Sequence, residues 1–129
     1  MTRTVDVVVI GMDLAATAAS IDAIRRGLRV LIVIRKQGTR VAHRHRQSLR
    51  AACTWSAGQV TIVSGALVAC VDGVNGIEAV VVRHVASGRV TGFNASALLD
   101  FGEPSGSTDS RAAIRARPAT RAGAPAASS

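Results

Sequence analysis

The sequence predicts an α/β fold, in which a parallel sheet carries a three-stranded antiparallel β-meander on one face and a disordered C-terminal tail follows. Three observations lead to this prediction. Two apolar runs flank a helical pattern within residues 4–36, three further apolar runs are separated by turn signals, and the composition changes sharply after residue 102. The 129 residues are enough for one folded domain.

Residues 4–36 predict a strand, a helix and a second strand. Residues 5–10 form a continuous apolar run that ends at Gly11, which is typical of a strand buried on both faces. Over residues 14–26 apolar and small side chains recur every three or four positions, and Gly27 follows as a C-cap. Residues 28–34 form the second buried strand. Because a helix crosses over between these strands, they must run parallel, and a Rossmann-like sheet is expected.

The later elements are predicted from weaker patterns. A helix is expected over residues 41–54. The pairs Asp72-Gly73 and Asn75-Gly76 indicate a turn, and Ser87-Gly88 predicts a two-residue hairpin. Strands are therefore expected at residues 59–63, 66–71, 76–85, 89–94 and 97–101.

Composition separates a folded domain, residues 1–102, from a tail, residues 103–129. The chain is 48% hydrophobic but only 2% aromatic, so Val, Ile, Leu and Ala must build its core. The tail consists mainly of Ala, Ser, Arg, Pro and Gly, and cannot bury enough apolar surface to offset the entropy lost on ordering. We therefore expect a disordered tail, in which only residues 111–117 could form a helical turn.

The net charge of +8 is concentrated in one segment. Within sixteen positions and without any acidic residue, the chain has six cations: Arg35, Lys36, Arg40, Arg44, Arg46 and Arg50. Such a cluster can bind the phosphate of a nucleotide or a nucleic acid, or it can be a solvated helix face.

The sequence predicts neither a metal site nor catalytic residues. Cys53 and Cys70 form no C-x-x-C pair and are expected to be buried free thiols. His43 and His45 form an H-x-H pair, but no carboxylate or thiol joins them at a suitable spacing. No serine lies in a nucleophile-elbow context.

No membrane partner is expected. No apolar run approaches the ~18 residues that a membrane helix needs. The short apolar run near the N-terminus faintly mimics a signal peptide, but Asp6 and Asp13 interrupt it. We expect a cytoplasmic protein.

The loop after the first strand, residues 11–16, bears on dinucleotide binding. In βαβ units of the dinucleotide-binding kind, glycines let the backbone approach the pyrophosphate, which sits on the helix N-terminus. Here the loop reads G-M-D-L-A-A, so the candidate binding residues are Gly11, Met12, Asp13 and Ala16. Gly11 fits the tight turn and Ala16 fits the third position, but the second glycine is missing. Asp13 takes its place if no gap is allowed, falls just after it if one residue is deleted, or simply caps the helix.

Cations follow the second strand, where a dinucleotide-binding unit has an acid that holds the ribose 2′-hydroxyl. The residues here are Arg35 and Lys36, with Arg40 a few positions later. Cations at this position suit a 2′-phosphate, as in NADPH, although they could also be ordinary basic loop residues. Asp100 ends the last strand at a carboxyl edge, where ligands of open α/β sheets bind, but it is expected to be a loop-edge acid.

Residues 34–40, I-R-K-Q-G-T-R, resemble the H-R-R-x-x-x-R segment of the NADPH domain of thioredoxin reductases. Ile34 replaces the His of that segment and Lys36 replaces its second Arg. The loop at residues 11–16 is similar to the G-x-G-D-S-A or G-x-G-N-T-A loop of the family, with one glycine fewer. The later strands and the turn at 102–104 follow the order of the family, so the resemblance covers roughly residues 4–104.

This resemblance implies that residues 1–102 form the FAD/NAD(P)-binding, Rossmann-like domain of a flavoprotein oxidoreductase, in a stand-alone, partial or degenerate form. The domain would hold NADPH for hydride transfer to an FAD held on a partner domain or chain. Gly11 and Ala16 would shape the pyrophosphate site, and Arg35, Lys36 and Arg40 would hold the 2′-phosphate. The sequence lacks the C-x-x-C of the family and any FAD domain, so we do not expect the chain to be active alone.

Two other functions remain open. The chain could be an FAD-binding fragment of another flavoprotein oxidoreductase, as the N-terminal position of the βαβ unit favours, although Arg35 stands where FAD domains carry an acid. It could also be a non-enzymatic basic module that binds phosphate or nucleic acid. The scarcity of aromatic residues removes platforms for base stacking, so nucleic acid is not the expected partner.

Overall fold

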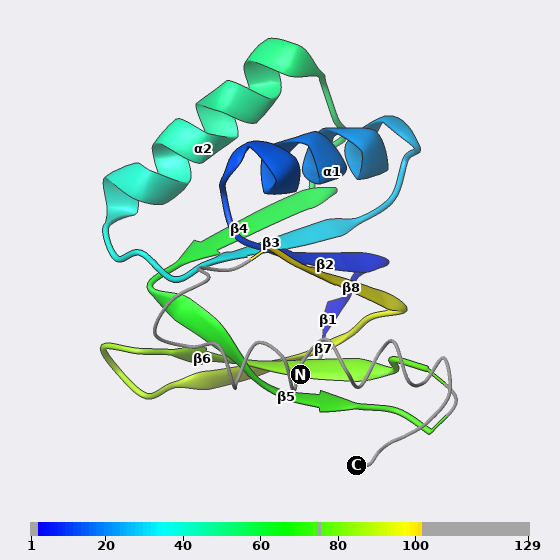
Figure 1. Cartoon of the computed structure of the whole chain (residues 1–129), viewed down its shortest axis with the longest axis vertical. Helices are drawn as coiled ribbons and strands as arrows, with labels where there is room; N and C mark the ends of the chain where they lie inside the picture. The colour runs from blue at the N-terminus through cyan, green and yellow to red at the C-terminus, as the bar shows by residue number, and fades with distance from the viewer. Residues whose placement is uncertain (1–2, 75, 102–129) are drawn as a thin grey trace.

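The computed structural model of this chain describes residues 3–74 and 76–101, apart from the side chain of Thr39. In this part of the chain, two helices cover one face of a four-stranded parallel sheet, and a second four-stranded sheet covers the other face (Figure 1). This arrangement confirms the predicted α/β fold with a meander on one face of a parallel sheet. The expected tail, with its possible helical turn, lies outside the described residues.

The parallel sheet contains the four strands with the most continuous apolar sequence. These are β2 (Val7–Ile10), β3 (Val30–Ile34), β4 (Val60–Ser64) and β8 (Ala97–Asp100), in the order β4-β3-β2-β8. All neighbouring strands run parallel. The chain moves outward from β2 through β3 to β4, and later returns to the other side of β2. The strand order therefore reverses between β2 and β8.

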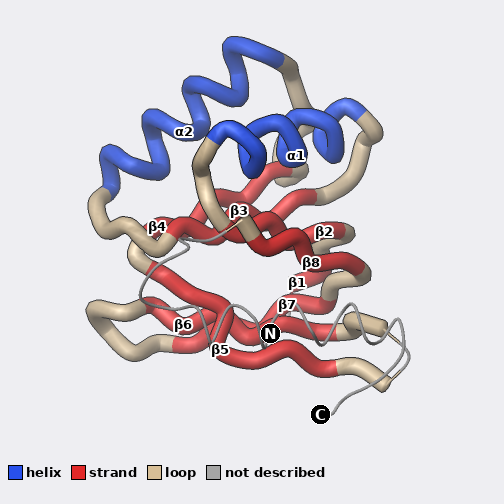
Figure 2. Tube along the Cα trace, in the orientation of Figure 1, coloured by secondary structure: helices blue, strands red, loops and turns tan. Residues whose placement is uncertain are grey.

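Helices α1 (Leu14–Arg25) and α2 (Thr39–Ala52) make the two crossovers and lie on the same face of this sheet (Figure 2). The buried side chains of α1 are mostly small and include Ala16, Ser20 and Ala23. Such side chains let the helix approach the strands closely. The helix ends because Gly27 adopts a φ of +80°, which favours glycine.

The second sheet is the predicted meander with one added strand. Strands β5 (Ala66–Asp72), β6 (Ala79–His84) and β7 (Val90–Asn94) pair antiparallel in chain order. The two-residue strand β1 (Arg3–Thr4) pairs parallel with β7. The described chain thus begins in this sheet and enters the parallel sheet only at β2.

Two apolar clusters hold the three layers together, because the parallel strands are buried on both faces. Alternate side chains of β2 and β3 point to opposite layers. The cluster between the two sheets includes Val8, Leu31, Val33, Val68, Val80, Val82 and Phe93. The cluster beneath the helices includes Val7, Val9, Ile32, Ile34, Ala16, Ile24 and Leu49.

Some predicted details are wrong. The strand expected at residues 5–10 begins only at Val7, because the chain first passes between the two sheets. The connection between β6 and β7 is longer than the two-residue hairpin expected at Ser87-Gly88. The backbone N–H of His84 donates to the carbonyl of Arg89 at 2.8 Å, and the N–H of Gly88 donates to the carbonyl of His84 at 2.8 Å. The loop between the hydrogen-bonded residues His84 and Arg89 therefore has four residues, 85–88.

The expectation that both thiols are buried is wrong for Cys70. This side chain is exposed on β5, next to an irregularity in the pairing with β6. Cys53, after the end of α2, is half-buried, and both thiols are free. The other elements lie where the sequence placed them, with ends that differ by no more than three residues.

Candidate functional site

The candidate site lies at the carboxyl ends of β2, β3 and β8. Ligands of open α/β sheets bind outside the carboxyl ends of the strands, where the strand order reverses. Here that point lies between β2 and β8. The chain leaves β2 to enter the N-terminus of α1, and leaves β3 to enter the N-terminus of α2. The structure thereby brings all the predicted site residues to one edge of the sheet: Gly11, Met12, Asp13, Ala16, Arg35, Lys36 and Arg40.

Gly11 allows a close approach between two chain segments. Its φ is +118°, and a Cβ added to it would lie 2.8 Å from the carbonyl oxygen of Phe101, which follows β8. Its N–H donates to the carbonyl of Val33 at 2.9 Å, and the N–H of Phe101 donates to the carbonyl of Ile10 at 2.8 Å. A side chain at position 11 would therefore separate the ends of β2 and β8.

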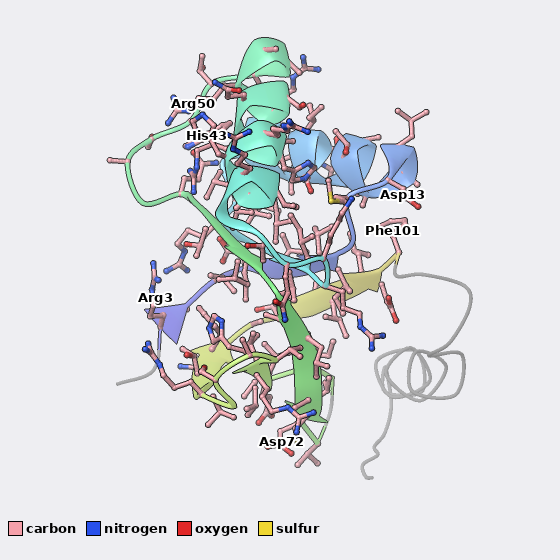
Figure 3. The ribbon with its side chains drawn as sticks, turned by 90° about the vertical axis from the view of Figure 1, so that its left-hand side faces the viewer. Arg3, Asp13, His43, Arg50, Asp72 and Phe101 are labelled. Atoms are coloured by element: carbon pink, nitrogen blue, oxygen red, sulfur yellow. The ribbon has the colours of Figure 1, made fainter. Side chains whose placement is uncertain are left out.

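Asp13 caps α1. Its Oδ1 accepts a hydrogen bond of 2.8 Å from the backbone N–H of Ala16, and its carbonyl accepts one from the N–H of Thr17 at 2.9 Å. Of the three interpretations left open by the sequence, helix capping is thus what the carboxylate does in this structure. Figure 3 shows Asp13 at the start of α1, on the same side of the molecule as Phe101.

The rest of this loop divides into exposed and buried positions. Met12 is 38% exposed and Leu14 is 87% exposed, so the start of α1 is open to solvent. Ala16 has no exposed surface, since it packs in the cluster beneath the helices. This burial is what the third position of a dinucleotide-binding loop requires, and it fits the register in which Asp13 stands at the second glycine position.

The loop between β3 and α2 is anchored through its backbone and presents cations to solvent. The N–H of Gly65 donates to the carbonyl of Lys36 at 2.9 Å, and the hydroxyl of Ser64 donates to the carbonyl of Gly38 at 3.1 Å. The side chains of Arg35, Lys36 and Arg40 are exposed. The ion pairs of the described chain join other arginines, Arg26 with Asp22 and Arg29 with Asp6, so no carboxylate there neutralises these three cations.

The N-terminus of α2 adds to this positive potential. Its N-cap is Gly38, with φ 128° and ψ 132°, and no side chain caps the helix. Its first turn contains no acidic residue. Arg40 therefore lies close to the positive end of the helix dipole, where a cation is unfavourable unless an anion binds nearby. The two helices of the site thus differ, since the N-terminus of α1 has an internal carboxylate and that of α2 does not.

The structure separates the six-residue basic cluster into two parts. Arg35, Lys36 and Arg40 lie at the edge of the sheet, whereas the other three arginines lie on later turns of α2. Of these, Arg44 and Arg50 are exposed and Arg46 is half-buried. The guanidinium of Arg50 stacks on the ring of Trp55, 4.4 Å from its centroid.

The two histidines of α2 do not form a pair. His43 is exposed, whereas His45 is only 4% exposed, because residues two apart on a helix point in different directions. Nε2 of His45 has no hydrogen-bond partner, and burial lowers the pKa of this imidazole below its usual 6.5. Within residues 3–74 and 76–101, no group of three or more His, Cys, Asp or Glu side chains could hold a metal ion.

Three features of the site escaped the sequence analysis. Asp100 ends β8, as the sequence predicted, but it faces Ile10 in the sheet register and is only 9% exposed, and this burial was not expected of a loop-edge acid. Phe101 limits the side chain at position 11, and Gly38 leaves α2 without a side-chain cap. A glycine directly before a helical pattern could have indicated the uncapped helix, whereas nothing in the sequence pairs residue 11 with residue 101.

Neither described helix is long and apolar enough to cross a membrane. No family model and no curated protein sequence matches this chain.

Solved structures match most of the chain. Thioredoxin reductase from Lactococcus lactis has 20% sequence identity and a TM-score of 0.59, and the match covers 79% of this chain and 32% of that one. Thioredoxin reductase from Streptococcus pyogenes has 19% identity and a TM-score of 0.58, with the same coverage. L-lysine 6-monooxygenase from Pseudomonas syringae has 10% identity and a TM-score of 0.54, with 79% of this chain and 36% of that one covered.

At these identities the likeness concerns the fold, and the chain spans 32–36% of the length of these three structures. Over the matched residues, these structures share with this chain the arrangement of helices and strands described above. The chain therefore shares the fold of the matched third of these thioredoxin reductases.

Proposed function

We propose that this chain is an NADPH-binding domain, resembling that of thioredoxin-reductase-like FAD-dependent oxidoreductases. The observation that carries the proposal is the set of exposed cations after β3, namely Arg35, Lys36 and Arg40. In a dinucleotide-binding unit, the side chains after the second strand of the βαβ unit contact the adenosine ribose, and arginine there accommodates a 2′-phosphate.

The donor set fits a phosphate group. Arg35 and Arg40 would each offer a planar guanidinium, and Lys36 an ammonium, all of which form charge-assisted hydrogen bonds with phosphate oxygens. The N-terminus of α2 has no carboxylate that competes for these groups. The same position would be unfavourable for FAD or NADH, whose ribose hydroxyls are held by an acid in this fold.

Gly11 supports a dinucleotide at the neighbouring strand. It makes the tight turn at the end of β2, where a φ of +118° and the close approach of Phe101 exclude a side chain. Met12, Asp13 and Ala16 complete this loop, and Ala16 brings α1 close to the sheet. NADPH, when bound, supplies a hydride, and the residues of this chain bind and orient the adenosine end of the cofactor.

Hydride transfer would need a flavin held by another domain or chain. The chain covers about a third of the matched thioredoxin reductases, and its two cysteines form no redox pair. We therefore propose a partner that carries FAD, and no activity of this chain alone.

Calorimetric titration of NADPH against charge-removing variants tests the 2′-phosphate assignment. Arg35→Gln and Lys36→Gln are each expected to weaken NADPH binding by about tenfold, as the loss of one charge-assisted contact predicts. Arg26→Gln is the matched control, because it removes one exposed cation at the far end of α1. NADPH affinities that stay at the wild-type value in both site variants would contradict the proposal.

A further inference from the structure

The N-terminus of α1 is occupied by a carboxylate at the position where a dinucleotide places its pyrophosphate. Helix N-termini attract anions because their first N–H groups have no partners within the helix. In α1 one of these groups, the N–H of Ala16, already donates to Oδ1 of Asp13 at 2.8 Å. A phosphate oxygen at this N–H would have to displace the carboxylate.

Three properties of the loop make this competition direct. Asp13 stands at the second glycine position of the loop, because it lies two residues after Gly11 and three before the fully buried Ala16. A side chain there takes the space that a glycine leaves for the pyrophosphate. In addition, the charge of Asp13 has no cationic partner among the ion pairs of the described chain, so it repels a second anion.

The second phosphate position of the proposed site is the opposite case. The N-terminus of α2 has no side-chain cap, and the exposed cations Arg35, Lys36 and Arg40 lie beside it. The first turn of α2 has no acidic residue that would repel an anion there, and the ion pairs of the described chain involve none of these three cations. The pyrophosphate and the 2′-phosphate of one NADPH molecule would therefore meet very different electrostatic environments.

We infer that Asp13 is a specificity-determining residue, which opposes binding of the pyrophosphate and leaves the adenosine 2′-phosphate as the part of the ligand that this site favours. This inference rests on the proposed function. It predicts a ranking of ligand affinities that a dinucleotide site with a glycine at position 13 would not show. Adenosine 2′-monophosphate should keep most of the affinity of NADPH, because the pyrophosphate of NADPH adds little.

Asp13→Asn separates the charge from the helix cap. Asparagine caps helices about as well as aspartate, so the variant is expected to fold, and a thermal melt checks this. Asp13→Gly provides a second variant, which also restores space at the loop. Asp22→Asn is the matched control, because it removes one exposed carboxylate from the same helix, away from the site.

The experiment compares three probes by calorimetry with the full chain: NADPH, NADH and adenosine 2′-monophosphate. Asp13→Asn and Asp13→Gly are expected to bind NADPH and NADH about tenfold more tightly than the wild type does, since a nearby like charge is removed. Binding of adenosine 2′-monophosphate should change by less than about twofold, and Asp22→Asn should change none of the three affinities.

The outcomes distinguish this inference from the proposed function. If the wild type binds NADPH but the Asp13 variants bind it no more tightly, the inference is wrong and the proposed function stands. If the affinity for adenosine 2′-monophosphate increases in the variants as much as the affinity for NADPH, the effect comes from the overall charge of the protein and the inference is again wrong. If neither the wild type nor the variants bind any of the three probes, the proposed function itself fails.

Discussion

The carboxylate of Asp6 and the side chain and backbone of Arg29 form a closed set of hydrogen bonds at the amino end of the parallel sheet. Oδ2 of Asp6 accepts from the backbone N–H of Arg29 at 2.7 Å and from its Nε at 3.3 Å, and Oδ1 accepts from Nη2 at 3.2 Å. The N–H of Asp6 donates in turn to the carbonyl of Arg29 at 2.8 Å. These contacts fix the point at which the chain passes from the second sheet into β2, next to the start of β3.

Asp6→Ala is expected to lower the free energy of unfolding by about 1–2 kcal/mol, because it removes three hydrogen bonds to a partly exposed carboxylate. Asp22→Ala is the comparison, because it breaks the more exposed ion pair between Asp22 and Arg26, which lie one helical turn apart. It should lower the free energy of unfolding by only about 0.3–0.5 kcal/mol. Urea unfolding followed by Trp55 fluorescence measures both. Equal losses in the two variants would show that the Asp6–Arg29 contacts add nothing specific.

The same contact has a pH signature. Hydrogen bonds from the side chain and then the backbone of Arg29 lower the pKa of Asp6 below 3.8. The unfolded chain therefore binds this proton more readily, and the stabilisation is present above pH 3.8 and is lost as the pH falls through the lower folded pKa. In unfolding curves recorded below pH 4, Asp6→Asn should show a weaker loss of stability with acid than the wild type. An identical acid dependence in both proteins would contradict this assignment.

Gly11→Ala is expected to destabilise the fold by about 3 kcal/mol or more. The new Cβ would meet the carbonyl oxygen of Phe101 at 2.8 Å, in addition to the strain of a φ of +118°. Gly58→Ala isolates the strain, because Gly58 has a φ of +81° but no atom within 4 Å of the added Cβ. That variant should cost about 1–2 kcal/mol. Thermal unfolding of the two variants measures the difference, and a smaller loss for Gly11→Ala would contradict the close approach of β2 and β8.

His45 should make stability depend on pH below 6.5. Burial lowers its pKa below 6.5 in the folded chain, so the unfolded chain takes up the proton first. The free energy of unfolding is thus highest above pH 6.5, decreases as the pH falls below 6.5, and stops decreasing below the folded pKa. His45→Leu should remove this decrease, as denaturation curves at several pH values would show. His43→Gln, which changes an exposed imidazole on the same helix, should keep it.

Arg50 and Trp55 provide a probe of the C-terminal end of α2. Arg50→Ala is expected to shift the fluorescence emission of Trp55, the only tryptophan of the chain, and to cost about 0.5–1 kcal/mol through the lost stacking. Arg44→Ala, on the same helix but outside this contact, should leave the emission unchanged. An emission maximum that does not respond to Arg50→Ala would mean that the two side chains are not stacked in solution.

The central fold could be predicted because its signals are local. The apolar runs of β2 and β3, the small residues of α1 and the glycine at the end of β2 are each visible within a few positions. The strand β1 was missed because two residues carry no periodicity, and because its pairing with β7 joins Arg3 to Phe93, which lie far apart in the sequence. The exposure of Cys70 was missed because it depends on an irregularity in the pairing of β5 with β6.

The site could be predicted in part for the same reason. The positions of Gly11, Arg35 and Lys36 follow directly from where strands end. The function of Asp13 stayed open, because the choice between its three interpretations depends on the residue at which α1 begins. The contact between Gly11 and Phe101 could not be predicted, since it brings together the ends of two strands that are neighbours only after folding.

The affinity ratio of NADPH to NADH in the wild-type chain tests the central claim most directly. The two ligands differ only by the 2′-phosphate, so their ratio isolates the contribution of the cations after β3. Calorimetry at about 0.15 M salt should show NADPH binding at least about tenfold more tightly than NADH, the result of one or more charge-assisted contacts with that phosphate. Equal affinities for the two ligands, or binding of neither, would contradict the account.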